Sequence, residues 1–94
     1  MLVVRSTEGR QENFYSLSEA AAGVIKNQWG TPVDGIHSET LRRRWRDTHA
    51  RHGKRIGRDV FFTADDMSRM GYEMNEDLGE DYLVIGDVVS LVIE

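Results

Sequence analysis

A basic segment in the middle of the chain, residues 38–62, reads SETLRRRWRDTHARHGKRIGRDVFF. Its first half has the spacing of an amphipathic helix, and its second half has the pattern of a β-hairpin with a glycine in the turn. Between residues 38 and 58, the only acidic residues are Glu39 and Asp47. The eight basic residues are Arg42, Arg43, Arg44, Arg46, Arg51, Lys54, Arg55 and Arg58. Binding responds to the local field, so the segment predicts a surface that faces a polyanion, although the whole chain has a net charge of -4.

The first half of this segment predicts a helix over residues 39–50. Ser38 is a favourable N-cap, and Glu39 in the first turn suits the positive end of the helix dipole. Leu41 and Trp45 are four residues apart, so they fall on one stripe of the helix. We expect that stripe to be buried.

The arginines of this helix point in different directions. At about 100° per residue, Arg43 and Arg46 lie opposite the buried stripe. Arg42 lies to one side of the stripe, and Arg44 borders it. Most of the arginine cluster is therefore expected to face outward.

The second half predicts a hairpin over residues 55–62, with its turn at residues 57–58. Thr63 and Asp66 follow as a capping signal for a short helix, which Gly71 is placed to end. The residues expected to pack inside this part of the chain are Leu41, Trp45, Ile56, Val60, Phe62, Met67 and Met70.

A further helix is predicted before the basic segment. Ser16 and Glu19 fit a capping box, and the apolar spacing behind them predicts a helix over residues 17–28. The sequence Gly-Thr-Pro at residues 30–32 stops it, because proline cannot continue a helix. Trp29 is expected to be a core anchor rather than an exposed aromatic.

The two ends of the chain carry β-type patterns. Residues 2–4 predict a short strand, and the polar residues 6–13 a loop or turn. Residues 72–81 are acidic and predict a loop, and the runs at 82–85 and 88–93 predict a C-terminal hairpin that residues 2–4 would extend. The last run is nearly all apolar, so we expect both of its faces to be covered, and a homodimer through the C-terminal strands is one way to cover them.

Composition limits the class of protein. A chain of 94 residues without cysteine is one domain, 1–94, with no disulfide or thiolate metal site. No apolar run reaches the roughly 18 residues that a membrane helix needs, so we expect a cytoplasmic protein. The chain has no glycine-rich phosphate loop and no recognisable nucleophile–base pattern, and its three histidines form no convincing metal site. We expect no enzyme activity, cofactor or metal.

A capped helix, an arginine-bearing helix and a basic hairpin followed by a short helix are the layout of a winged helix-turn-helix. The segments 15–21 (YSLSEAA), 38–43 (SETLRR) and 55–67 (RIGRDVFFTADDM) resemble the winged-helix domains of phage excisionases and MerR-type regulators. The resemblance covers about residues 14–70. It implies that the helix beginning at Ser38 enters the DNA major groove. It also implies that Arg42 and Arg43, with Arg55 and Arg58 of the wing, contact DNA.

The predicted fold is α+β, with a winged helix-turn-helix core of three short helices and a β-hairpin wing at residues 14–71. An acidic loop and a C-terminal β-hairpin at residues 72–94 add terminal strands. The predicted function is sequence-specific binding of double-stranded DNA. The predicted contacts are Ser38, Thr40, Arg42, Arg43, Arg46, Lys54, Arg55 and Arg58.

Two roles share this predicted surface. One is a recombination directionality factor that works with an integrase or another protein partner, and the other is a small transcriptional regulator. The competing class is a protein-interaction module, for example one encoded by a phage, that keeps the fold and uses the arginine face to bind an acidic protein partner. The net negative charge and the C-terminal strands favour that class slightly.

Overall fold

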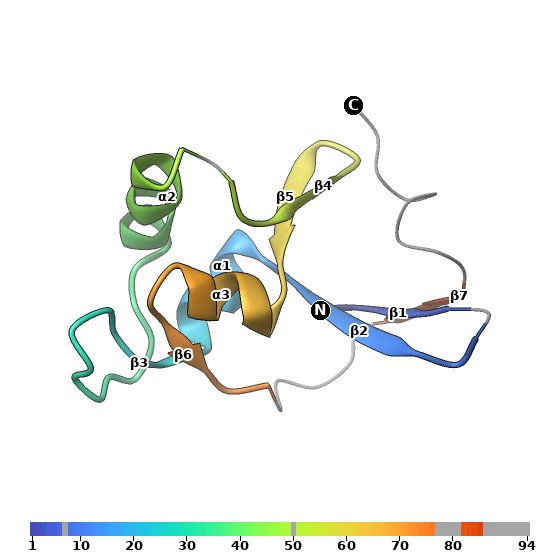
Figure 1. Cartoon of the computed structure of the whole chain (residues 1–94), viewed down its shortest axis with the longest axis horizontal. Coiled ribbons are helices and arrows are strands. Elements are labelled where there is room, and N and C mark those ends of the chain that lie inside the picture. The colour runs from blue at the N-terminus through green and yellow to red at the C-terminus, as the bar shows by residue number, and fades with distance from the viewer. Residues whose placement is uncertain (7, 50, 77–81, 86–94) are drawn as a thin grey trace.

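The computed structural model describes residues 1–6, 8–49, 51–76 and 82–85, and within these ranges the chain has an α+β fold (Figure 1). The three helices there are α1 (Leu17–Ala22), α2 (Ser38–Asp47) and α3 (Ala64–Arg69). The strands are β1 (Leu2–Arg5), β2 (Gln11–Ser16), β3 (Val24–Lys26), β4 (Lys54–Ile56), β5 (Asp59–Phe62), β6 (Glu73–Met74) and β7 (Tyr82–Ile85). The predicted α+β class with three short helices is confirmed.

Five strands form one sheet in the order β4-β5-β2-β1-β7, and β3 pairs with β6 in a second, small sheet. β1 pairs antiparallel with β2 and parallel with β7, so that Leu2 lies between Phe14 and Tyr82. β2 continues beyond β1 to pair with β5, where Tyr15 lies opposite Phe62. The long strand β2 therefore joins the N-terminal strand to the β4–β5 hairpin.

The predicted strand at residues 2–4 is confirmed as β1, but the loop predicted over residues 6–13 is wrong in its second half. The chain turns at Ser6, whose backbone N–H donates to the carbonyl of Arg10 (2.7 Å), and β2 begins directly afterwards. Pairing with β1 satisfies the backbone of this polar stretch. A strand can be polar where one of its faces meets solvent.

The capping box at the start of α1 is confirmed. The hydroxyl of Ser16 accepts from the backbone N–H of Glu19 (3.3 Å), and the Glu19 carboxylate accepts from the backbone N–H of Ser16 (3.0 Å). These two bonds satisfy amide groups that have no partner inside the helix.

The predicted length of this helix, residues 17–28, is wrong. α1 ends at Ala22, and the N–H of Gly23 caps it by donating to the Glu19 carbonyl (3.0 Å). Val24 and Ile25 then belong to strand β3, which pairs antiparallel with β6, about fifty residues later in the sequence. β-Branched residues accept extended backbone easily, and this long-range pairing outweighs their helical spacing.

The arginine-bearing helix is confirmed with shifted ends. His37 rather than Ser38 is the N-cap, and its Nδ1 accepts from the backbone N–H of Glu39 (3.1 Å). The helix stops at Asp47 instead of continuing to residue 50, and the next turn contains His49 in the left-handed conformation (φ 58°). Histidine offers a ring nitrogen in place of the usual oxygen, which is why the sequence pattern favoured the neighbouring serine.

The hairpin and the third helix follow the sequence pattern. In the β4–β5 pair, Arg55 lies opposite Val60, and Gly57 adopts a left-handed φ of 65° in the turn. Thr63 and Asp66 form the second capping box. The Thr63 hydroxyl accepts from the backbone N–H of Asp66 (3.1 Å), and the Asp66 carboxylate accepts from the backbone N–H of Thr63 (3.0 Å). The predicted hairpin and cap are confirmed.

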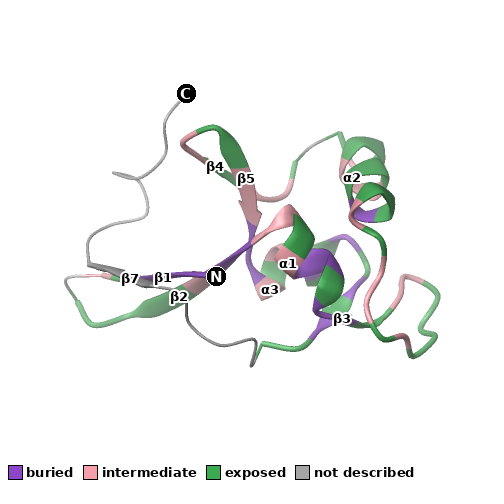
Figure 2. Cartoon of the chain, turned by 180° about the vertical axis from the view of Figure 1, so that it is seen from behind, coloured by how far each residue is buried: buried purple, intermediate pink, exposed green. Residues whose placement is uncertain are grey.

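The main core lies between the sheet and the helices, where the purple segments of Figure 2 gather. Leu41, Phe62, Met67 and Met70 are fully buried there, as predicted. Trp45 is half-buried and meets the Phe62 ring edge to face, with the ring centroids 6.3 Å apart. A smaller cluster packs on the other face of β1 around Leu2, Val4 and Phe14.

The prediction that Trp29 anchors the core is wrong. Its side chain is 78% exposed, because α1 ends before it and the chain places it in a turn after β3. The acidic loop predicted over residues 72–81 contains strand β6 at its start. The predicted strand at residues 88–93, and with it the predicted dimer surface, lies outside the described residues.

Candidate nucleic-acid interface

The outer surface of α2 carries two fully outward arginines, Arg43 and Arg46, here called the arginine ridge. They lie on the side of the helix opposite the buried Leu41, as the sequence pattern predicted. Arg44 differs from them, because its Nε donates to the backbone carbonyl of Met70 (2.9 Å) and the side chain is half-buried. The packing of α2 on the end of α3 therefore fixes which arginines face solvent.

The remaining predicted residues of α2 lie on its two flanks. Arg42 is exposed and forms an ion pair with Glu39 one turn earlier (3.4 Å). An exposed pair of this kind is weak, so Arg42 can exchange Glu39 for another anion at little cost. Ser38 is half-buried, and Thr40 is exposed on the flank away from Ser38.

The β4–β5 hairpin presents its basic residues to solvent. Lys54, Arg55 and Arg58 are all exposed. The hairpin is held against α2 by Trp45, whose Nε1 donates to the carbonyl of His52 (2.7 Å) in the connection between the two elements. The helix and the hairpin are thus joined by a packed contact as well as by the chain.

α2 and the β4–β5 hairpin rise on the same side of the molecule, with α1 and α3 beneath and between them (Figures 1 and 2). Between them is a cavity of about 510 Å³, here called the hairpin groove. Its polar and basic lining residues are Ser16, Ser18, Ser38, Arg42 and Arg58. Its apolar lining includes Leu17, Trp45, Val60 and Phe62, and Asp59 is its acid.

The charges of this surface are largely free to meet a ligand. Within the described part of the chain, none of the following forms an ion pair: Arg43, Arg46, Lys54, Arg55 and Arg58. Unpaired guanidinium and ammonium groups create a local positive potential, and a groove between low-dielectric walls concentrates it. Serine hydroxyls and arginine forks are both common donors to phosphate oxygens.

The structure brings together three of the predicted contacts, Ser38, Arg42 and Arg58, in the hairpin groove. The arginine ridge stands beside that groove, and Thr40 lines a different groove on the other flank of α2. Sequence reasoning missed Ser16 and Ser18 as groove residues. Their place in the first turn of α1 was visible, but only tertiary packing sets that turn beside α2 and the hairpin.

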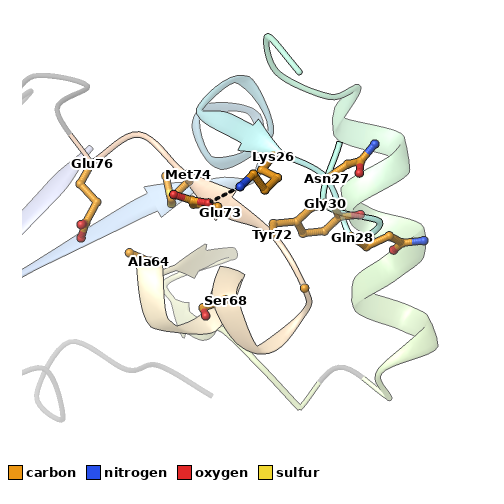
Figure 3. A pocket seen from close by; sticks show the side chains of 11 residues that line it. Lys26, Asn27, Gln28, Gly30, Ala64, Ser68, Tyr72, Glu73, Met74 and Glu76 are labelled. Atoms are coloured by element: carbon orange, nitrogen blue, oxygen red, sulfur yellow. Dashed lines mark ion pairs between the residues drawn. The ribbon is translucent and has the colours of Figure 1, made fainter. Parts of the chain in front are cut away.

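A separate cavity of about 540 Å³ lies between the β3–β6 pair and α3 (Figure 3). Lys26 and Glu73 face each other across its wall, with Nζ and Oε2 3.7 Å apart. Tyr72 also lines it; burial raises the pKa of the Tyr72 hydroxyl, while the charge of Arg44 acts in the opposite direction. Among its described lining residues the charged ones are the Lys26–Glu73 pair and Glu76, so this cavity holds no basic cluster like that of the hairpin groove.

Among the described residues, no group of three or more His, Cys, Asp or Glu side chains is placed to hold a metal ion. The helices described there are also too short or too polar to cross a membrane. Comparison with known proteins found no matching family model, curated protein or solved structure.

Proposed function

We propose that the protein binds double-stranded DNA, with α2 in the major groove and the β4–β5 hairpin on the adjacent backbone. The observation that carries this proposal is that α2 and the hairpin lie on one side of the molecule, and that both carry basic residues with no ion pair among the described residues. The major groove of B-DNA is about 12 Å wide and admits one α-helix. α2 is the helix whose outer face is basic.

The residues divide into two tasks under this proposal. The arginine ridge, Arg43 and Arg46, points straight out of α2 and is placed to reach base edges, where a guanidinium can bind guanine through two parallel hydrogen bonds. Arg42 and Arg58 face the hairpin groove, where the nearby serine hydroxyls suit a phosphate. Thr40, Lys54 and Arg55 extend the surface on either side.

The fold class that fits this use is a winged helix-turn-helix of the excisionase and MerR type. Its support is the element order α1, α2, hairpin, α3, together with the two capping boxes and the hairpin at the positions where the sequence resembles that family. The connection between α1 and α2, residues 23–37, is longer than the tight turn of those domains and contains β3. In the proposed complex this segment lies beside α2 and leaves the outer face of the helix open to DNA.

Two biological roles use the same surface: a recombination directionality factor, with an integrase as partner, and a small transcriptional regulator. They differ in how copies assemble on DNA. The first class often lines up along direct repeats, whereas the second usually binds a palindrome as a dimer. The repeat symmetry of a selected binding site therefore separates them.

The proposal is tested by fluorescence anisotropy with duplex DNA. We expect Arg42→Ala/Arg58→Ala to weaken binding by about tenfold or more, and to reduce the slope of log affinity against log salt by about two. The matched control is Arg5→Ala/Arg10→Ala, which removes two exposed arginines from the β1–β2 end of the sheet. Equal losses in both variants would mean that only net charge matters, and would contradict the assignment.

A further inference from the structure

An exposed tryptophan is held on a structured turn beside α2. The side chain of Trp29 is 78% exposed, although an indole is among the side chains that gain most from burial. The turn is ordered by Asn27, whose Oδ1 accepts from the backbone N–H groups of Trp29 and Thr31 (3.0 Å each). Two backbone hydrogen bonds, between Asn27 and Thr31 and between Gly30 and Asn27 (2.9 Å each), close it. The indole is therefore presented by a defined loop.

This turn borders α2 on the flank away from the hairpin. A cavity of about 240 Å³, here called the Trp29 groove, separates the two. The helix contributes Thr40, Arg43, Arg44 and Asp47 to it, whereas Ser38, Arg42 and Trp45 of the same helix line the hairpin groove. At about 100° per residue, Ser38 and Arg42 lie on one side of the arginine ridge and Thr40 and Asp47 on the other, while Arg43 belongs to both the ridge and the Trp29 groove. The ridge thus stands between the hairpin and the Trp29 turn.

We propose that the Trp29 turn, residues 27–31, is a second arm that contacts the DNA, with the indole against the sugar-phosphate wall of the groove that α2 enters. This inference rests on the proposed function and names a further contact for it. A duplex pressed on the arginine ridge extends over both flanks of α2, because the groove is about as wide as the helix. The charged residues that line the Trp29 groove are Arg43, Arg44 and Asp47, so its lining carries a net positive charge. Arg43 forms no ion pair within the described residues, and this excess of positive charge suits a polyanion.

The indole can make an apolar contact that the charged arginines do not make. Its flat apolar face can pack on the deoxyribose of the groove wall, and contacts to the sugar-phosphate backbone do not depend on the base sequence. Trp29 therefore contributes affinity and fixes the angle of α2, while the ridge reads the bases. In this arrangement the long connection between α1 and α2 positions the Trp29 turn for its contact with DNA.

The fluorescence of Trp29 tests the proposal directly. Trp29 and Trp45 are the two tryptophans of the chain, so Trp45→Phe leaves Trp29 as the single indole emitter. On titration with duplex DNA, we expect the emission of Trp29 to be quenched and its accessibility to acrylamide to fall. Binding that leaves both properties unchanged would overturn the proposal while the DNA-binding function stands. The turn would then be free for a protein partner.

A second measurement leaves Trp45 and its packing intact. We expect Trp29→Ala to weaken binding to duplex DNA by about tenfold, a loss within the range seen when an interface tryptophan is truncated to alanine. We expect Trp29→Tyr to recover most of this loss. The control is Ile25→Ala, which removes another exposed apolar side chain that does not line the Trp29 groove. Unchanged affinity in Trp29→Ala would overturn the arm, whereas no binding by the folded wild type would overturn the DNA-binding function with it.

Discussion

Neighbouring arginines on α2 have different tasks although they are chemically identical. Arg44 is half-buried and donates to the Met70 carbonyl, so it ties α2 to the end of α3. Arg43 is exposed and, within the described residues, forms no ion pair. The direction of each side chain around the helix sets this difference, because one residue corresponds to a rotation of about 100°.

We predict that this pair separates stability from binding. Arg44→Ala should lower the free energy of unfolding by about 1–2 kcal/mol, because a charge-assisted hydrogen bond and the packed stem are lost. Arg43→Ala should leave stability nearly unchanged and weaken DNA binding by about tenfold or more. Urea denaturation and anisotropy titration measure the two quantities. A stable Arg44→Ala protein, or a destabilised Arg43→Ala protein, would contradict the assigned roles.

The position of the β4–β5 hairpin depends on a close backbone approach in the segment that follows α2. Gly53 has a φ of 91°, and a Cβ there would lie 3.0–3.1 Å from the Phe62 ring, the Phe61 carbonyl and the Val60 side chain. Gly30 has a φ of 77°, but a Cβ there would meet nothing within 4 Å. These two glycines share a left-handed backbone and differ in their surroundings.

The difference in stability between alanine variants of the two glycines therefore measures how tightly Gly53 packs against the hairpin. Gly30→Ala should cost about 1 kcal/mol of stability through its backbone alone. Gly53→Ala should cost about 1–3 kcal/mol more, because the added methyl crowds the base of the hairpin. The loss should be accompanied by weaker DNA binding, since the hairpin must shift. Equal unfolding midpoints in urea for the two variants would show that the approach at Gly53 does not constrain the hairpin.

The elements that the sequence predicted well are those specified by neighbouring residues. The caps at Ser16 and Thr63 and the turn at Gly57 depend on side chains a few positions apart, and all three are present. The predicted length of α1 was wrong because residues 24–26 form strand β3, whose partner strand β6 lies some fifty residues later in the chain. A helical spacing of apolar residues cannot reveal a long-range strand partner.

In the candidate site, too, features set by nearby residues could be predicted and features set by tertiary packing could not. The outward direction of Arg43 and Arg46 followed from helical geometry once Leu41 was placed in the core. The hairpin groove did not follow, because it needs the first turn of α1 beside two elements that are distant in sequence. The exposed Trp29 was missed for the related reason that a longer α1 would have buried it.

At the scale of the whole molecule, charge is divided unevenly. Two-thirds of the Lys and Arg residues lie between residues 38 and 58, and residues 73–94 contain seven acids and no Lys or Arg. The chain therefore has a basic face, formed by α2 and the hairpin, although its net charge is -4. Such a face attracts a polyanion by releasing its counterions, and this gives the binding a strong dependence on salt.

The salt dependence of binding to duplex DNA tests the central claim most directly. Anisotropy titrations at about 50 to about 200 mM salt, with wild type beside Arg43→Ala/Arg46→Ala, should show wild-type affinity falling on the order of 10³-fold, as expected for several phosphate contacts. The double variant should bind weakly throughout and with a smaller slope. Folded wild-type protein that fails to bind at low salt, or a double variant that binds like wild type, would contradict the claim that α2 binds DNA.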